Sequence, residues 1–149
     1  MSIAPQDLVE AALSVATLPC VGSVRERTEA NLRWANNALI TNGEMRSRTL
    51  TVTATAEVEG GMAAGTVSQE IAGVAEVAAV VAAAEGLART GRPAEDAAPM
   101  VQNYAHNDVW TDPPEATSIE VLDDLAKGLG DAFERAEAAQ HLLYGFAEH

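Results

Sequence analysis

Two histidines stand close to carboxylates in this 149-residue chain, and they are the first candidates for chemistry. His106 lies two residues before Asp108 in a stretch with several prolines, which predicts a loop, and loops often carry functional residues. A histidine beside an aspartate suits proton transfer or metal binding. A metal site needs three or four converging ligands, however, so the sequence favours a solvated loop histidine.

Glu137 and His141 form the second pair and lie one turn apart near the end of a predicted helix. The helix dipole favours a histidine close to a helix C-terminus, which explains this position without a ligand. His149 is the last residue, and its sequence context gives no basis for an assignment. We therefore assign no catalytic residue, no cofactor-binding residue and no metal ligand to this chain.

The remaining polar motifs are better explained as structure than as chemistry. Glu95-Asp96 and Asp123-Asp124 are adjacent acids, and neighbours on a helix do not face each other as a general acid/base pair must. Gly60-Gly61 precedes a predicted strand, so it lacks the helix N-terminus that a phosphate loop uses, and a hairpin turn is expected. Cys20 opens an apolar strand with no histidine nearby and is expected to be a buried, inert thiol.

Composition limits the classes of partner. The chain has 22 acidic and 9 basic residues, a net charge of −13, which opposes binding to nucleic acid and to anionic membranes. A single cysteine excludes an intrachain disulfide and fits a reducing cytoplasm. The N-terminus is not a signal peptide, and no apolar run is long enough to span a bilayer. We predict one cytoplasmic domain over residues 1–149 that binds neither nucleic acid nor membrane.

The elements that must position any site are clearest between residues 31 and 69. Residues 49–58 alternate polar and apolar, with Leu50, Val52 and Ala54 on one side, which predicts a strand with one buried face. Asn36-Asn37 predicts a tight turn, and Asn42-Gly43 is a second candidate. Propensity favours a turn at Asn42-Gly43, whereas the alternative is one strand over 38–58 with a bulge at Gly43, and we adopt the bulged strand.

The other elements follow from periodicity and from their end signals. We expect helices at 5–16, 74–90 and from Thr117 onward, and strands at 20–27, 31–35, 62–68 and 142–147. The second helix should bury one face, made of Val74, Val77, Val80, Val81, Ala84 and Leu87. Thr117 and Glu120 have the spacing of a capping box. The predicted fold is α+β, a mostly antiparallel sheet of about five strands with about three helices packed mainly on one face.

The order of these pieces resembles the N-terminal domain of the TldD/TldE (PmbA) family of zinc metallopeptidases, most clearly its TldD-related members. The resemblance lies in the strand that begins NLRW, the long strand, its glycine-rich turn, the Ala/Val helix and the closing LLYGFAEH. The long strand departs from it, with Thr-Leu-Thr-Val-Thr-Ala where many relatives have glycines. The family's His-Glu-x-x-x-His motif lies far downstream in full-length members and is absent here.

The resemblance implies a non-catalytic front domain that helps to enclose a zinc site elsewhere in the protein. Zinc is expected only in the missing C-terminal part of an active member. The implied partners are that C-terminal domain, a TldD/TldE-like subunit in a homo- or heterodimer, and an unfolded or modified peptide as substrate. Because the sequence ends inside a predicted strand, we expect a truncated piece or the product of a split gene.

Two other functions remain open at this point. A stand-alone interaction module would use an exposed sheet edge and the acidic surface, with Arg33, Trp34 and Trp110 as candidate partner contacts. The final predicted strand is the expected edge. A small hydrolase built around His106 and Asp108 is the third hypothesis, and the sequence gives it the least support.

Overall fold

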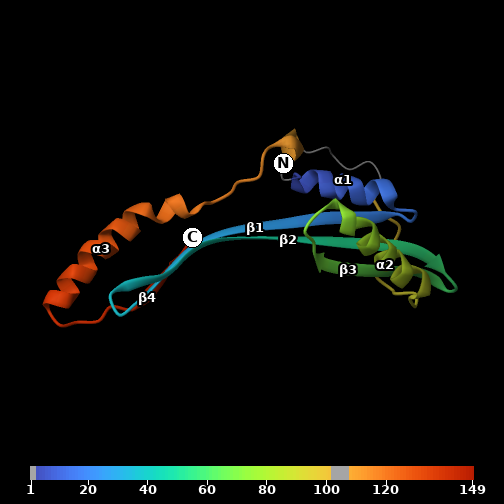
Figure 1. The fold of residues 1–149 in the computed structure, drawn as a ribbon. Coiled ribbons are helices and arrows are strands. Elements are labelled where there is room, and N and C mark those ends of the chain that lie inside the picture. Colours follow the sequence, from blue (N-terminus) through green and yellow to red (C-terminus); the bar gives the residue numbers. More distant parts are fainter. Residues whose placement is uncertain (1–2, 102–107) are drawn as a thin grey trace. The chain divides into compact units, whose positions relative to one another are not determined.

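The computed structural model describes residues 3–101 and 108–149 (Figure 1). In these ranges the helices are α1 (Pro5–Val15), α2 (Val77–Thr90) and α3 (Asp123–Ala138), with 3-10 turns η1 (Val74–Glu76), η2 (Asp108–Thr111) and η3 (Ile119–Leu122). The strands are β1 (Cys20–Ala35), β2 (Ala38–Val58), β3 (Gly61–Glu70) and β4 (Gly145–Glu148), in the sheet order β3-β2-β1-β4. The predicted α+β class is confirmed. No helix in these ranges is long and apolar enough to cross a bilayer.

Strand β1 is continuous, so the prediction of two separate strands at 20–27 and 31–35 was wrong. The intervening Thr28-Glu29-Ala30 carries no strong strand signal of its own. The backbone of Ala30 nevertheless exchanges two hydrogen bonds with that of His149, at 3.0 and 2.9 Å. Pairing with distant residues therefore extends the strand, and the described sheet has four strands where about five were predicted.

Strand β2 runs unbroken from Ala38 to Val58, which confirms the long strand and excludes a turn at Asn42-Gly43. It is connected to β1 by Asn36 and Asn37, whose φ angles of 52° and 59° are those of a type I′ hairpin. The turn places Ala35 opposite Ala38, and the hydrogen bond from the Thr55 N–H to the Pro19 carbonyl places Thr55 opposite Pro19. Between these two pairs, β2 has one residue more than the chain opposite it. We infer that β2 contains a bulge, and its assignment to Gly43 stays a prediction.

The chain divides into two compact units. Unit 1 comprises Met1–Glu26 and Ser47–Pro114, and unit 2 comprises Arg27–Arg46 and Glu115–His149. Strands β1 and β2 contribute residues to both units, and each unit is described below by itself. The expectation of a single domain stays a prediction.

The main core lies in unit 1, where α1 and α2 cover the same face of the sheet (Figure 1). Leu50, Val52 and Ala54 of β2 are completely buried, as their alternation predicted. They pack with Leu8 and Ala12 of α1 and with the buried stripe of α2. Much of this core is alanine and valine, so its stability depends on close approach of the elements more than on large side chains.

The buried face of α2 differs from the predicted one. Val74 and Leu87 are 52% and 51% exposed, whereas Glu85 and Ala88 are buried in their place. Val74 belongs to the 3-10 turn η1, which has a different periodicity from the helix that follows. The helix therefore buries its valines together with Ala84, Glu85 and Ala88.

Gly65 of β3 is the reason that α2 lies so close to the sheet. A Cβ atom at this position would lie 2.3 Å from the Ala84 carbonyl oxygen and 2.4 Å from the Ala88 nitrogen. Both contacts are with helix backbone, which cannot move aside as a flexible side chain does. The glycine therefore permits the contact between α2 and β3 on which this core depends.

The opposite side of the sheet in unit 1 carries hydroxyl groups. Thr51 pairs with Ser68 and Thr53 with Thr66 across β2 and β3, at 2.8 and 2.9 Å. Thr55 continues the row, but it lies opposite Ala64, and its buried hydroxyl has no partner in the described part of the chain. Hydroxyls in the middle of this face satisfy each other, and Glu57 of β2 and Glu70 of β3 place charges toward its two ends.

Unit 2 contains the distal part of the β1–β2 hairpin, β4 and α3, and Figure 1 shows α3 running along this part of the hairpin. The predicted capping box is absent: Thr117 Oγ1 pairs with His149 Nδ1 at 2.9 Å, and no side chain caps η3. The Ile119 N–H instead donates to Glu44 Oε1 at 2.6 Å. A carboxylate from β2 therefore replaces the local cap.

Asn37 attaches the segment before β4 to the hairpin turn. Its side-chain amide donates to the His141 carbonyl at 2.8 Å and accepts from the Leu143 N–H at 2.7 Å. Tyr144 Oη adds a hydrogen bond to Asn36 Oδ1. These contacts fix the chain just before it enters β4.

Replacing Gly65 by alanine is expected to destabilise unit 1 by about 3 kcal/mol, because α2 must move away from β3 to admit the methyl group. Urea unfolding followed by circular dichroism measures this change. Gly43→Ala is the matched control, since no atom lies within 4 Å of a Cβ at Gly43. Equal stability of the two variants would refute the packing role of Gly65.

Replacing Asn37 by glycine keeps the positive φ of the turn but removes its two side-chain hydrogen bonds, so unit 2 should lose about 1–2 kcal/mol. Hydrogen exchange should show faster exchange of the amides of Leu143 and β4. Asn37→Asp is the informative comparison, because it keeps the acceptor for Leu143. Unchanged exchange of β4 in the glycine variant would contradict this role of Asn37.

Candidate functional site

Buried charged groups are the natural place to look for chemistry. In residues 3–101 and 108–149, Arg48 and Glu85 are buried as whole residues, at 7% and 5% exposure, and the side chain of Glu26 is buried against Arg48. Arg48 and Glu85 lie in different environments, and Glu85 has the more extensive set of hydrogen bonds. Glu85 was not predicted from the sequence as a functional residue, and its hydrogen bonds indicate whether its carboxylate is reactive.

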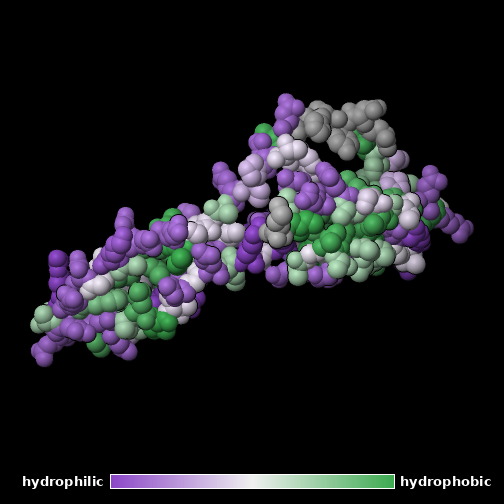
Figure 2. Space-filling view, turned by 45° about the horizontal axis from the view of Figure 1, so that its top comes forward, coloured by the Kyte–Doolittle hydropathy of each residue, from purple (hydrophilic) through white to green (hydrophobic). Residues whose placement is uncertain are grey.

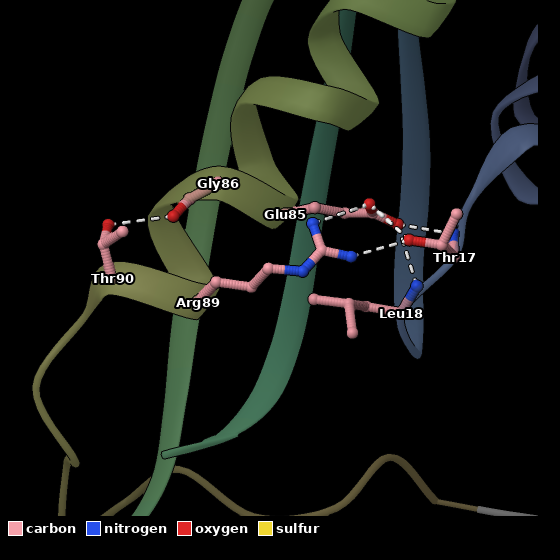
Figure 3. Close-up of polar contacts among 6 residues, drawn as sticks. All are labelled: Thr17, Leu18, Glu85, Gly86, Arg89 and Thr90. Atoms are coloured by element: carbon pink, nitrogen blue, oxygen red, sulfur yellow. Dashed lines mark hydrogen bonds and ion pairs between the residues drawn. The ribbon is translucent and has the colours of Figure 1, made fainter. Parts of the chain in front are cut away.

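Four donors surround the Glu85 carboxylate (Figure 3). The N–H groups of Thr17 and Leu18 donate to Oε1 at 2.5 and 2.8 Å. Thr17 Oγ1 donates to Oε2 at 2.7 Å, and Arg89 Nη1 reaches the same oxygen at 3.2 Å. Arg89 Nη2 also donates to Thr17 Oγ1 at 2.7 Å, which closes the network.

This network lowers the pKa of Glu85 to about 2. The hydrogen bond from the Thr17 hydroxyl is the largest cause, followed by that from the Leu18 N–H, and burial acts in the opposite direction. A carboxylate that is ionised and fully hydrogen-bonded is a poor base at neutral pH. Glu85 is therefore suited to hold the chain after α1 against α2, and not to accept a proton from a substrate.

Cys20 lies near this carboxylate and is partly exposed. Burial raises the pKa of its thiol, and the negative charge of Glu85 raises it further. Because the thiolate is the reactive form, the thiol has less nucleophilic character than an ordinary cysteine. The expected burial of Cys20 was therefore wrong in degree, since the thiol is partly exposed at the first residue of β1, whereas its raised pKa agrees with the inert character expected from the sequence.

Arg48 of β2 forms an ion pair with Glu26 of β1, and both side chains are buried, at 8% and 7% exposure. Removal of one partner from a buried pair leaves an uncompensated charge, which is strongly destabilising. The pair therefore serves to hold β1 and β2 together. Its charges compensate each other, as those of Glu85 and Arg89 do.

The described histidines do not meet acidic residues in a reactive arrangement. His141 lies beyond the end of α3, and its backbone accepts from Asn37 and donates to the Ala136 carbonyl. His149 uses Nδ1 to pair with Thr117. His106 lies outside the described residues, so its predicted role as a solvated loop residue remains a prediction. Across the described ranges, no three His, Cys, Asp or Glu side chains are grouped to hold a metal ion.

The paired acids lie at the surface. Glu95 and Asp96 are exposed in the segment after α2. Asp123 and Asp124 are the first two residues of α3, where negative charge is favoured by the helix dipole, and Asp124 contacts Lys127 at 3.5 Å. The predicted hairpin turn between β2 and β3 is present at Glu59 and Gly60, and Gly61 is the first residue of β3; Gly60 and Gly61 have φ angles of 93° and 148°.

The three candidate partner contacts are not brought together. Arg33 is exposed on β1, whereas Trp34 beside it is half-buried with its ring against Gly145. Trp110 belongs to unit 1, is 40% exposed and donates to Glu10 Oε1 at 3.1 Å. Contact of these residues with a partner stays a prediction.

A shallow hollow of about 300 Å³ in unit 2 is lined by Thr28, Glu44, Met45, Arg46, Ala116 and Thr117. Its polar groups are engaged within the chain: Thr28 Oγ1 accepts from the Thr117 N–H at 3.1 Å, and Glu44 accepts from Ile119. These bonds attach the segment before α3 to the hairpin. The hollow therefore has a structural explanation without a ligand.

Comparison with known proteins gives a distant likeness to a solved structure. No family model matches the sequence, and no curated protein matches it. Among solved structures, the chain is similar to TldE from Thermococcus kodakarensis, with 10% sequence identity and a TM-score of 0.48. The similarity covers 96% of this chain but 36% of that one, so the chain spans about a third of its length. A likeness at this level does not by itself assign the chain to a family.

Glu85 should make the free energy of unfolding decrease as the pH falls. Its pKa is about 2 in the folded state, below the ordinary value of 4.5, so its contribution is complete above about 4.5 and is lost as the pH falls through about 2. We expect Glu85→Gln to be less stable than the unmodified chain at pH 7, with the difference narrowing below pH 4.5. Urea unfolding from pH 7 to pH 2 measures it.

Glu95→Gln is the control for this experiment, since Glu95 is exposed and makes no hydrogen bond or ion pair in the described part of the chain. Its stability should follow that of the unmodified chain at every pH. A difference between Glu85→Gln and the unmodified chain that stays constant down to pH 2 would show that the carboxylate charge does not carry the interaction.

Proposed function

We propose that this chain is a non-catalytic framework domain of a TldD/TldE-like zinc metallopeptidase, one that helps to enclose the site where unfolded or modified peptides are cut. The resemblance of the sequence to the N-terminal domain of that family supports the proposal. The order of elements agrees with that resemblance, from the opening helix through the long strand and the Ala/Val helix to the closing strand. The likeness to TldE adds no independent support.

The non-catalytic part of the proposal rests on the buried ionisable groups, which already have hydrogen-bond or ion-pair partners within the chain. The Glu85 carboxylate accepts four hydrogen bonds from Thr17, Leu18 and Arg89, and Arg48 pairs with Glu26. A catalytic base needs a free lone pair and a pKa near the working pH. These groups have the opposite character, which is that of a structural support.

In this proposal, the zinc ion and the residues that break the peptide bond belong to a C-terminal domain of the same protein or to a partner subunit. The chain would act in the cytoplasm as part of a homo- or heterodimer with a TldD/TldE-like subunit. Its contribution is the wall of an enclosure and surface for assembly. Neither requires a reactive side chain from residues 1–149.

A stand-alone interaction module is the second candidate, and one observation favours it. Strand β4 is at the edge of the sheet, as the final strand was predicted to be, and one side of it is free of a described neighbour. An open edge can accept another strand by backbone hydrogen bonding. Such a module would act without a peptidase partner.

Two measurements test the framework proposal and separate it from the module. We expect isothermal titration to show no stoichiometric zinc binding, and we expect no cleavage of an unfolded peptide by the chain alone. Co-expression with a TldD/TldE-like subunit of the same organism should give a complex that cleaves that peptide. The control is the same subunit expressed without the chain.

The outcomes distinguish the hypotheses. Tight zinc binding at one site that is lost in His141→Ala would contradict the non-catalytic assignment. A reading frame that continues past His149 into a helix with two histidines flanking a glutamate supports the framework proposal. Failure to form a complex with any TldD/TldE-like subunit would favour the module.

A further inference from the structure

Strand β3 is at one edge of the sheet, and alternate residues of it direct their backbone groups to the open side. The Ile71 N–H donates to the Arg48 carbonyl of β2 at 2.9 Å, so Ile71 faces β2. Residues of an antiparallel ladder alternate between facing the neighbouring strand and facing away from it. The odd-numbered residues of β3 therefore pair with β2, and the even-numbered residues present their N–H and C=O groups to the open side.

Three successive positions on this open side lack a hydrogen-bond partner. The Met62 carbonyl accepts from the Ala94 N–H at 3.0 Å. Beyond it, the outward backbone groups of Ala64, Thr66 and Ser68 make no bond within the described part of the chain, and all three residues are exposed. Edge strands are commonly protected by a charge, a proline or a bulge. The ladder of β3 is regular, the strand has no proline, and its one charged residue is the last.

Helix α2 has an uncharged outer side next to this edge. A Cβ atom added at Gly65 would lie 2.7 Å from the Leu87 Cβ, so Leu87 lies over β3. Its neighbours Ala84 and Ala88 are completely buried, whereas Leu87 is 51% exposed, which places it on the open side of the strand. Figure 2 shows hydrophobic residues at the surface of the part of the chain where α1 and α2 lie. The exposed residues of α2 before Arg89 are all uncharged, and they are Ala78, Ala79, Ala82, Ala83, Gly86 and Leu87.

Both features are typical of a surface that is covered. A helix that is apolar all round is normally buried. Open backbone groups at every second position of a strand are satisfied by another extended strand, because its own groups have the same spacing. The occupant that fits this surface is therefore a β-strand with an uncharged element beside it.

A second copy of the chain meets both requirements. The net charge of −13 opposes contact between copies in general, but Ala64, Thr66 and Ser68 bring no charge to the contact. The open side of β3 is self-complementary, because a two-fold axis at Thr66 places Thr66 opposite its own copy and Ala64 opposite Ser68. The same axis places the two α2 helices side by side, where their alanines permit close approach. One symmetry operation thus covers the strand edge and the helix together.

We propose that two copies of this chain pair through β3, antiparallel about a two-fold axis at Thr66, to form one continuous sheet with each α2 beside its counterpart. Each facing pair exchanges two backbone hydrogen bonds, which satisfies the open groups of Ala64, Thr66 and Ser68. The bond from Ala94 to Met62 limits the pairing at its ends. The proposal does not rest on the peptidase assignment, because it concerns contacts between copies of this chain.

Amide hydrogen exchange of the unmodified chain, followed by NMR at increasing protein concentration, tests the pairing directly. The amides of Thr66 and Ser68 should exchange rapidly in dilute solution and about tenfold more slowly once the dimer forms. Light scattering on the same samples measures the mass. The amides of Gly65 and Val67 are the internal control, since they face β2 and should be protected at every concentration.

Charged variants test the two-fold axis. Thr66→Glu and Thr66→Lys should each weaken the dimer about tenfold or more, because the axis brings two like charges opposite each other. An equimolar mixture of the two variants should restore the dimer, now with opposite charges across the axis. Ser23→Glu and Ser23→Lys are the matched controls, since Ser23 is exposed on β1 in the same unit, and they should associate as the unmodified chain does. Ala83→Glu should weaken the dimer through α2.

Circular dichroism melts show whether each variant is folded, and hydrogen exchange of the unmodified chain decides the question if the Thr66 variants are not. Four results overturn the proposal. They are a monomer at every concentration, a dimer in which the Thr66 and Ser68 amides stay unprotected, a dimer that persists in both folded Thr66 variants, and a dimer that the Ser23 variants weaken equally. Each would mean that the edge of β3 does not join two copies of this chain.

Discussion

The Glu85 carboxylate is the interaction on which the order of unit 1 depends. The core there contains many alanines and valines, and such small side chains tolerate several orientations of a helix. Glu85 removes this freedom, because its four hydrogen bonds to Thr17, Leu18 and Arg89 have a fixed geometry. It connects the chain that follows α1 to the middle of α2. Apolar burial drives the association, and the carboxylate selects one arrangement.

Unit 2 likewise combines apolar burial with a few directional polar contacts. Few side chains there are fully buried, and Asn37 and Glu44 provide the directional contacts. Each reaches a backbone amide that lies far away in the sequence, at Leu143 and Ile119. Both units therefore use a small number of polar side chains to hold backbone segments that have little apolar area of their own. Such contacts are worth most when partly buried, where water competes less well for the donors.

Much of the fold was predictable because it depends on local patterns. The alternation in residues 49–58 gave β2 its buried face, and Asn36-Asn37 gave the hairpin turn. The continuity of β1 was not predictable, because its middle is held by the backbone of His149. The capping box failed for a similar reason, since Thr117 pairs with His149 while Glu44 serves η3. In each case, a contact distant in sequence replaced the local preference.

The role of Glu85 could not be predicted from the sequence either. Its partners Thr17 and Leu18 are separated from it by 68 and 67 residues, and a glutamate within an Ala/Val helix has no pattern that marks it as buried. The stripe predicted for α2 included Leu87 and omitted Glu85 and Ala88, because periodicity alone does not fix which face of a helix meets the sheet. The expectation that no histidine of the chain binds a metal stays a prediction, and His106 lies outside the described residues.

The contact at Gly65 limits how this protein can diverge. Where helix and strand backbones touch, a larger residue on one side cannot be balanced by a smaller one on the other, because glycine and alanine already leave almost nothing to remove. Core sequences commonly diverge when a larger side chain at one position is balanced by a smaller one at a neighbouring position, and this exchange is not possible at Gly65. Descendants of this sequence should keep small residues here while the rest of the core changes, so that the seam between α2 and β3 outlasts any overall sequence similarity.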